Sequence, residues 1–314
     1  SLVRVRDRNR RDSRGGSGRF LFCPTPYCGR MVDRRLGGEG YLEILGTELD
    51  PEVGVLWTGP EIVSAEIAVG PVEAVARALR RKPVIWDNLH ANDYDGRRFF
   101  CGPYAGRPLA LKEAVGGLLS NANCELPLNY IPFRTLAAFV RAKGAWDPRQ
   151  AYLEALREWQ DHFQTCGGTV VFEDLLQFTD CFYLPHQLGP GGAALLELAE
   201  RILTSPATAW GDEVVRFRRL AARLRATCGR MAELRRRPLF HALCRRVWEL
   251  REELDLLERY IEFRLAHPDP AAKWGSDFHL PGTYRGGITA RLQQLLRLEA
   301  DGSVTHPGMK GGGT

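Results

Sequence analysis

The sequence of 314 residues lacks any long apolar run. No stretch approaches the roughly 18 to 20 consecutive apolar residues of a membrane-spanning helix, and the amino end carries charges where a secretion signal needs an apolar segment. The eight cysteines form no CxxC pair and no regular framework, which indicates reduced thiols rather than a disulfide scaffold. We therefore expect no membrane insertion and no secretion, and the reduced thiols predict a cytosolic or nuclear protein.

The positive and negative charges cancel over most of the chain, since residues 20–314 sum to zero. The chain carries +5, and residues 1–19 account for all of it, because seven arginines there face only Asp7 and Asp12. A nucleic-acid partner needs a basic face on the folded body, since affinity comes from neutralising many phosphates at once. We interpret residues 1–18 as a disordered Arg-rich head in preference to an RNA-binding arm, and we expect no nucleic-acid partner.

Glycine-rich phosphate-binding motifs are also missing. No GxGxxG or GxxxxGK[ST] follows an apolar run, so a nucleotide-binding α/β fold has no support. Four short apolar runs bounded by turn residues predict buried strands, at residues 20–24, 53–59, 83–87 and 117–121. Segments with helical spacing lie between these runs, and the repeat is about 30 residues long.

Strands that alternate with helices in this way predict a parallel sheet, either doubly wound or closed as a (β/α)8 TIM barrel. Each run ends in polar groups, and in a barrel all of these ends converge on one mouth, where barrel enzymes keep their chemistry. A complete barrel needs eight strands, and only four units are present. The sequence therefore predicts an α/β domain over residues 19–150 that forms half of a barrel.

The apolar period changes to 3.6 beyond about Tyr152, and predicted strands disappear. Two long heptad-like stripes, Val214–Leu234 and Leu243–Ile261, are separated by Pro238 and predict an antiparallel pair of helices. The predicted organisation after the barrel is an all-α helical bundle over residues 151–300, an interdomain linker at 166–169 and a disordered tail at 301–314.

The densest polar cluster, at residues 86–95, reads WDNLHANDYD and follows the third predicted strand. Its carboxylates and amides suit the hydroxyls of a sugar, and its aromatic faces suit the apolar side of a sugar ring; a polar turn or a helix cap fits the same pattern. His90 and its aspartate neighbours lack the spacing of a zinc or calcium site, and neither Cys23 nor Cys28 has an assignable base. We expect a hydrogen-bonded histidine, no metal, no cofactor and no nucleophilic cysteine.

Four stretches of the sequence closely resemble the protein O-GlcNAcase family, glycoside hydrolase family 84: FLFCPTPYCG (20–29), VLWTGPEIVSAEI (55–67), PVIWDNLHANDYDGRRFFCGPYAGR (83–107) and LLSNANCELPLNY (118–130). Residues 172–193 and YRGGI at 284–288 resemble the helical stalk of that family. The resemblance runs in order over residues 19–300. It implies the second half of a (β/α)8 glycosidase barrel followed by a stalk that forms a homodimer.

The resemblance also implies an activity, a β-N-acetylglucosaminidase that removes O-linked N-acetylglucosamine from Ser/Thr of intracellular proteins by substrate-assisted catalysis through an oxazoline. O-GlcNAc-modified proteins would be its partners, and from the resemblance together with the reduced thiols we expect a cytoplasmic and nuclear location. The residues that it implies as substrate-binding are Cys23, Tyr27, Thr58 and Trp86 around the acetamido group, Asn88 holding that group and the catalytic acid, Asp93 and Asn121 on the sugar hydroxyls, Tyr94 lining the site, and Asp87 within the same loop.

The chain departs from the family at the catalytic aspartate pair. That pair belongs ahead of residues 20–24, and the sequence contains no Asp-Asp dipeptide. Since the chain also begins with serine, we expect an incomplete form of an enzyme that is inactive as written and has no catalytic residue of its own. A non-catalytic family member that serves as a dimerisation or glycopeptide-binding module stays open. A helical nucleic-acid binder, suggested by arginines at 216–237, conflicts with the neutral body.

Overall fold

The computed structural model describes residues 20–269, 272–275 and 286–306, so the Arg-rich head lies outside the described residues. The described residues form two compact units. The first unit contains residues 20–89, 104–122 and 136–147, and the second contains 90–103, 123–135 and the described residues from 148 onward. Within these residues, no helix is long and apolar enough to cross a membrane.

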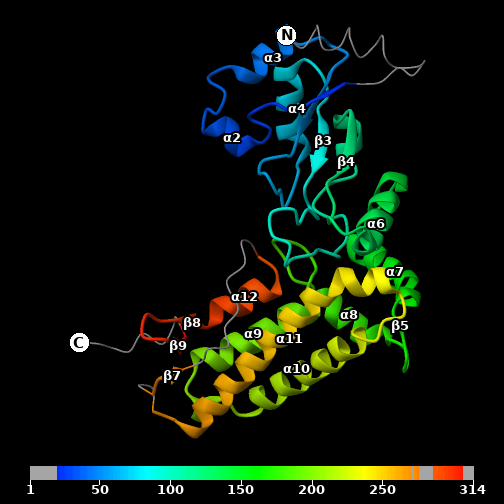
Figure 1. Ribbon diagram of the computed structural model, residues 1–314. Coiled ribbons are helices and arrows are strands. Elements are labelled where there is room, and N and C mark those ends of the chain that lie inside the picture. Colours follow the sequence, from blue (N-terminus) through cyan, green and yellow to red (C-terminus); the bar gives the residue numbers. More distant parts are fainter. Residues whose placement is uncertain (1–19, 270–271, 276–285, 307–314) are drawn as a thin grey trace. The chain divides into compact units, whose positions relative to one another are not determined.

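The first unit is built on a four-stranded parallel sheet with the order β1-β2-β3-β4 (Figure 1). Its strands are β1 (Leu21–Phe22), β2 (Gly54–Trp57), β3 (Val84–Asp87) and β4 (Gly117–Ser120). The four predicted strands and their parallel pairing are confirmed, although each strand is shorter than its apolar run. Because all four run in the same direction, their carboxyl ends lie along one edge of the sheet.

Helices cover one face of this sheet (Figure 1). They are α3 (Tyr41–Glu48), α4 (Val69–Leu79) and α5 (Leu111–Ala114), whereas α2 (Gly29–Asp33) has no buried residue. Val55 and Ile85 are fully buried on that face, in one core with Leu42 of α3, Leu79 of α4 and Leu111 of α5. Successive strand residues point to opposite faces, so this set fixes which side chains the helices cover.

The opposite face of the sheet is apolar and in large part exposed to solvent. Leu21, Trp86 and Leu119 retain 46%, 36% and 43% of their exposure, and the β3–β4 register places Trp86 directly beside Leu119. A parallel sheet is normally covered on both faces. Among the described residues of the first unit, the second face has no comparable core.

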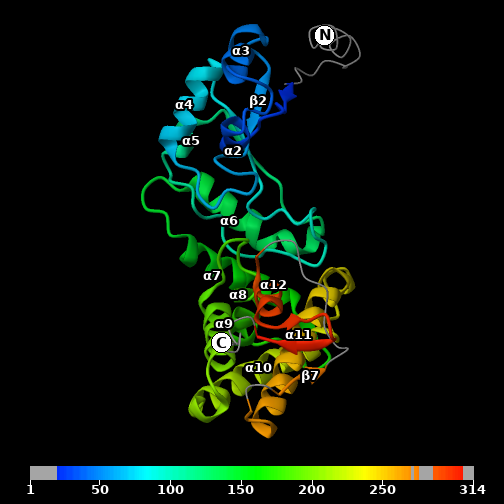
Figure 2. The same ribbon diagram turned by 90° about the vertical axis from the view of Figure 1, so that its left-hand side faces the viewer.

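The second unit is mainly helical (Figure 2). Its helices are η1 (Leu126–Asn129), α7 (Pro148–Trp159), η2 (Gln160–His162), α8 (Phe172–Asp180), α9 (Pro190–Thr204), η3 (Ala207–Ala209), α10 (Asp212–Met231), α11 (Arg237–Ala266) and α12 (Ile288–Leu295). The residues of α6 (Tyr130–Arg141) are divided between the two units.

The antiparallel pair predicted from the two apolar stripes is confirmed in α10 and α11, which lie side by side in both views (Figures 1 and 2). Arg218 Nε lies 2.7 Å from Glu258, whereas Arg225 Nε lies 2.6 Å from Asp255. Partner numbers that fall as the arginine numbers rise require opposite helix directions. Pro238 stands in the first turn of α11, where its missing N–H costs no helical hydrogen bond.

Two predictions for this region are wrong. Residues 166–169 are not an interdomain linker, because β5 (Gln164–Thr165) and β6 (Gly168–Thr169) form an antiparallel hairpin there. The predicted disordered tail begins too early, because β9 (Ser303–Thr305) pairs with β7 (Trp274–Gly275) and β8 (Arg297–Leu298); residues 307–314 lie outside the described residues. Strands of two or three residues are too short to show an alternating pattern.

Candidate functional site

The segments that follow β1 and β2 are tied together by hydrogen bonds. Thr58, the first residue after β2, donates its N–H to the Tyr27 carbonyl at 2.9 Å and its hydroxyl to the Glu61 carbonyl at 2.8 Å. The Gly29 N–H donates to the Gly59 carbonyl at 3.0 Å. Thr58 is buried, so its hydroxyl is committed to the loop. It therefore positions Tyr27 beside the carboxyl end of β2.

Cys23 and Tyr27 follow β1, Cys23 exposed and Tyr27 half-buried. Partial burial raises the pKa of the Cys23 thiol. Burial, and then the proximity of Cys28 and Cys23, raises the pKa of the Tyr27 hydroxyl. Because the thiolate is the reactive form of cysteine, a thiol with a raised pKa suits the wall of a pocket better than nucleophilic catalysis.

A buried ion pair stands at the end of β3. Arg107 donates from Nε to Asp87 Oδ2 at 2.7 Å and from Nη2 to Asp87 Oδ1 at 2.6 Å, and both side chains are almost fully buried. The remaining guanidinium donors reach the carbonyls of Ser64, Ala65 and Ala105. Both carboxylate oxygens of Asp87 therefore hold Arg107. That geometry fits a positioning role between Trp86 and Asn88 rather than direct contact with a ligand.

Tyr104 and Gly106 complete the surroundings of this ion pair. Burial opposes the charge of Arg107, but the adjacent Asp87 carboxylate outweighs it and raises the pKa of the guanidinium. Burial, followed by the charge of Asp87, raises the pKa of the Tyr104 hydroxyl far above its usual range. Gly106 has a positive φ of 74°, and a Cβ there would overlap the Ala65 carbonyl. Glycine is thus needed where the two chain segments meet.

Two asparagine side chains connect the ends of β3 and β4. Asn121 donates from Nδ2 to Asn88 Oδ1 at 2.9 Å, and Asn88 donates from Nδ2 to the Ile62 carbonyl at 2.7 Å. The Asn121 N–H donates to the Asp87 carbonyl at 2.8 Å. Both side chains are half-buried, so each keeps polar atoms toward solvent. An amide pair fixed in this way can both donate to and accept from a hydroxylated ligand.

The first unit brings together most of the sequence-predicted site residues along the carboxyl edge of its sheet: Cys23, Tyr27, Thr58, Trp86, Asp87, Asn88 and Asn121. Asp93 and Tyr94 belong to the second unit, where Asp93 is exposed and Tyr94 is half-buried. In the same loop, His90 Nε2 lies 2.9 Å from the Gly102 carbonyl. The prediction of a hydrogen-bonded His90 is confirmed.

The described residues hold no group of three or more His, Cys, Asp or Glu side chains arranged to bind a metal ion. Within the first unit, the fixed polar groups at the sheet edge are amides, a hydroxyl and a paired carboxylate. This set can orient an acetamido group and hydroxyls. The titratable groups among the predicted site residues at this edge are the Asp87 carboxylate, whose two oxygens accept hydrogen bonds from Arg107, and the Cys23 thiol and Tyr27 hydroxyl, whose pKa values are raised chiefly by burial.

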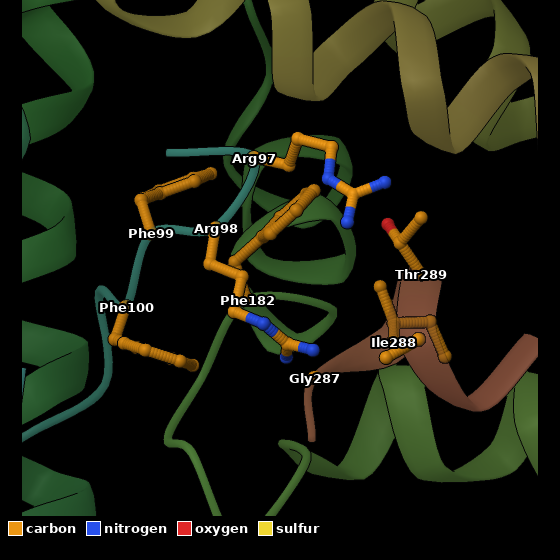
Figure 3. Close-up of a pocket in the computed structure, with 9 residues that line it drawn as sticks. Arg97, Arg98, Phe99, Phe100, Phe182, Gly287, Ile288 and Thr289 are labelled. Carbon is orange, nitrogen blue, oxygen red and sulfur yellow. The ribbon is translucent and has the colours of Figure 1, made fainter. Parts of the chain in front are cut away.

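A small pocket lies at the start of α12 in the second unit (Figure 3). Arg97 and Arg98 extend toward the first residues of α12, and Phe99 stacks on Phe182 with ring centroids 4.5 Å apart. Asp95 lies 3.3 Å from Arg97 Nε and 3.5 Å from Arg98 Nε. Since that carboxylate balances charge inside the loop, the pocket is a packing junction between residues 90–103 and α12.

Sequence reasoning missed Arg107, Tyr104 and Ser64. Ser64 accepts from the Glu61 N–H at 3.0 Å and donates to the Thr58 carbonyl at 2.8 Å. A usable signal existed for Arg107 alone: a buried strand that ends in aspartate needs a cation nearby. Arg97, Arg98 and Arg107 all follow Asp87 closely, and only the fold shows that the third is its partner.

Comparison with known proteins shows which family contains this chain. The family model described as beta-N-acetylglucosaminidase matches residues 2–179, more than half of the chain. The chain belongs to the beta-N-acetylglucosaminidase family. The matched range contains all nine predicted substrate-binding residues.

Individual relatives agree with the family. The chain is 48% identical over 123 residues to protein O-GlcNAcase of Mus musculus and of Rattus norvegicus, which covers 39% of this chain and 13% of each relative. It thus spans a small part of the length of those relatives. An O-GlcNAc hydrolase mutant of Thermobaculum terrenum matches in structure with a TM-score of 0.60 and 23% identity, over 83% of this chain and 52% of that one. That likeness supports the α/β fold.

Proposed function

We propose that this chain is part of an O-GlcNAcase-type glycoside hydrolase that removes O-linked N-acetylglucosamine from Ser/Thr of intracellular proteins. The observation that carries the proposal is the group of seven predicted site residues at the carboxyl edge of four parallel strands, in a chain of the beta-N-acetylglucosaminidase family. Carboxyl edges of parallel strands are where α/β enzymes bind their substrates. The two curated relatives carry the name protein O-GlcNAcase.

Roles for these residues follow from their chemistry. Cys23, Tyr27 and Trp86 present neutral and aromatic surfaces that suit the 2-acetamido group, and Thr58 holds Tyr27 in place. The linked amides of Asn88 and Asn121 suit the acetamido group and a sugar hydroxyl, respectively. Asp87 acts through Arg107 as a positioning residue. Asp93 and Tyr94 contribute a hydroxyl contact and a lining side chain in the proposal.

The proposed architecture is the second half of a (β/α)8 barrel followed by a helical stalk. The exposed face with Leu21, Trp86 and Leu119 supports it, because inward-pointing residues of a barrel meet those of its other strands. The proposed domain bounds are residues 19–150 for the half-barrel and 151–300 for the stalk. In the substrate-assisted mechanism that we propose, the acetamido oxygen attacks the anomeric carbon as its bond to the Ser/Thr oxygen breaks, which gives an oxazoline that water then opens. An aspartate pair from the other half of the barrel would assist: one aspartate orients the amide, and the other protonates the leaving oxygen and then activates the water.

The proposed function can be tested by measuring whether a coexpressed second segment restores hydrolysis to this chain. We expect no hydrolysis of an aryl N-acetylglucosaminide by residues 1–314 alone, because the general acid and the group that orients the nucleophile each contribute about two to four orders of magnitude. Coexpression with the part of mouse protein O-GlcNAcase that precedes its matched 123 residues should restore hydrolysis. The mouse segment alone is the control and should be inactive.

Two variants sharpen this experiment. Leu119→Asp should abolish the restored activity, because it places a charge on the exposed sheet face, whereas Ile44→Asp changes a residue of 57% exposure on α3 and should not. Hydrolysis by the chain alone, or equal loss in both variants, would contradict the half-barrel. Binding of a glycopeptide without restored hydrolysis would favour the non-catalytic glycopeptide-binding module, which the lack of an Asp-Asp dipeptide supports.

Homodimerisation through the helical unit and a cytoplasmic and nuclear location complete the proposal. Val215 on α10 and Trp248 on α11 are 65% and 59% exposed, so both are available for a contact with a second copy. Leu292 and Leu295 of α12 are buried within the chain, so they are unsuitable for testing a dimer. All eight cysteines are unpaired, as in a reducing compartment. A monomer in sedimentation velocity at high concentration would contradict the dimer.

A further inference from the structure

The turn between α10 and α11 and the first residue of α11 carry three consecutive exposed arginines, Arg235, Arg236 and Arg237. Several other arginines of this helical pair are neutralised. Arg218 and Arg225 contact Glu258 and Asp255, and Arg223 contacts Asp174. Among the described residues, no carboxylate lies within ion-pair distance of the three arginines at the turn. Arg216 and Arg219 of α10 also lie outside ion-pair distance of the described carboxylates, so what distinguishes residues 235–237 is that three such arginines follow one another.

The backbone of the turn is fixed in place. The Arg235 N–H donates to the Gln164 carbonyl of β5 at 2.9 Å, and the Arg236 carbonyl accepts the Phe240 N–H at 3.0 Å. The Arg237 guanidinium lies 3.9 Å from the centre of the Phe240 ring, a stacked arrangement that limits its rotamers. A ligand would meet arginines whose main chain is already ordered, which reduces the entropy cost of binding.

Arg236 lies close to His162 of η2. Partial burial, and next the charge of Arg236, lowers the pKa of His162, while Asp161 acts in the opposite direction. Arg230 donates from Nη2 to the Thr169 carbonyl at 2.9 Å, which holds β6 near the same turn. The tip of the β5–β6 hairpin is exposed and uncharged, so it adds no negative charge to this surface.

We propose that Arg235, Arg236 and Arg237 form a docking surface for an acidic segment of a partner protein, whose carboxylate or phosphate groups the guanidinium groups bind. Guanidinium groups pair with both kinds of oxyanion in a bidentate manner. The extent of the surface favours a peptide over nucleic acid. Three residues span at most about 10 Å, whereas nucleic-acid affinity needs many phosphate contacts along a basic face, and Arg218, Arg223 and Arg225 on α10 are paired with acids. The proposal does not depend on the glycosidase function.

Fluorescence anisotropy with labelled 12-residue peptides tests this surface on the full chain. The probes are a glutamate-rich peptide, a phosphoserine peptide, a glutamine/serine peptide and a single-stranded RNA whose charge matches that of the glutamate peptide. Because residues 1–19 hold seven arginines, every protein tested carries serine at those seven positions. We expect both acidic peptides to bind with a Kd that rises steeply with salt, and the comparison between them tells which oxyanion is preferred.

The informative variant is Arg235→Ser/Arg236→Ser, which keeps the main-chain hydrogen bonds and places a favourable capping residue ahead of α11. We expect it to raise the Kd of both acidic peptides by about tenfold or more. The matched control is Arg216→Ser/Arg219→Ser, which removes the same charge from exposed positions of α10, roughly 20 Å along the helix. Equal weakening in both variants, unchanged affinity in the first, or tighter binding of the RNA would overturn the proposal.

Discussion

Replacing Asp87 with alanine is expected to lower the free energy of unfolding of the first unit by about 3 to 5 kcal/mol. The side chains of Asp87 and Arg107 are 3% and 0% exposed, and the carboxylate accepts two short hydrogen bonds from the guanidinium. Removing the carboxylate leaves a buried, unpaired cation at the end of β3. The cost arises from that orphaned charge more than from the lost attraction.

Amide hydrogen exchange measures this effect where it occurs. Peptides that cover β2 and β3 should exchange faster in Asp87→Ala, while peptides from α10, in the second unit, provide an internal reference. Glu61→Gln is the matched control, because it breaks the Arg30–Glu61 ion pair of the same unit, in which both side chains are more than 40% exposed. Exposed pairs contribute about 0 to 1 kcal/mol. Equal effects from the two substitutions would mean that the buried pair is not structural.

The sequence allowed the strands and long helices of this fold to be predicted because each carries an apolar period of its own. The runs at 53–59 and 83–87 became β2 and β3, and the stripes of α10 and α11 were recognisable from spacing alone. The short elements carried no such signal. The β5–β6 hairpin and the β7–β9–β8 sheet are held by main-chain pairing of two or three residues, and hydrogen bonds of the main chain leave little trace in side-chain identity.

The sequence predicted the residue types of the candidate site, but it did not predict which side chains pair with one another. Polar groups after each strand were visible in the sequence, and the parallel sheet explains why seven of them share one edge. Asp87 was grouped with ligand-binding residues because it lies within the WDNLHANDYD cluster. Its pairing with Arg107, 20 positions away, depends on how the chain returns to Gly106 and Ala65. Contacts across such a separation are set by tertiary structure, which local patterns do not encode.

A pH-dependent change in stability is expected from Glu253 on α11. Its side chain is 1% exposed, and Oε1 has no hydrogen-bond partner among the described residues; the same holds for Oε1 of the adjacent Gln293 on α12. Burial raises the Glu253 pKa to about 7, Gln293 opposes the shift, and the charges of Glu249 and Glu252 add to it. When Glu253 is protonated, its carboxyl O–H can donate a hydrogen bond in a place where two oxygens otherwise lack a donor. Folding therefore stabilises the neutral form of Glu253 relative to the charged form.

The sign of the effect follows from linkage. A carboxyl whose pKa is higher in the folded than in the unfolded chain costs nothing when both forms are protonated, and it destabilises the fold increasingly as pH rises from about 4.5 to about 7. At 1.36 kcal/mol for each pKa unit, the loss reaches at most about 3 kcal/mol. His162 and His306, whose pKa values are lowered chiefly by burial, act in the opposite direction, because they lose stability as pH falls.

Comparison with Glu253→Gln isolates the carboxyl from those histidines. The amide has the same shape and no charge, so the variant should match the natural chain near pH 4, differ from it little near pH 5 and exceed its Tm by several degrees near pH 8. Glu262→Gln, at an exposed position of the same helix, should leave the pH profile of the natural chain unchanged. Thermal unfolding followed by circular dichroism at 222 nm, where helices dominate the signal, provides the measurement. Parallel Tm profiles for Glu253→Gln and the natural chain between pH 5 and 8 would show that this carboxyl is already charged, and solvated, in the folded protein.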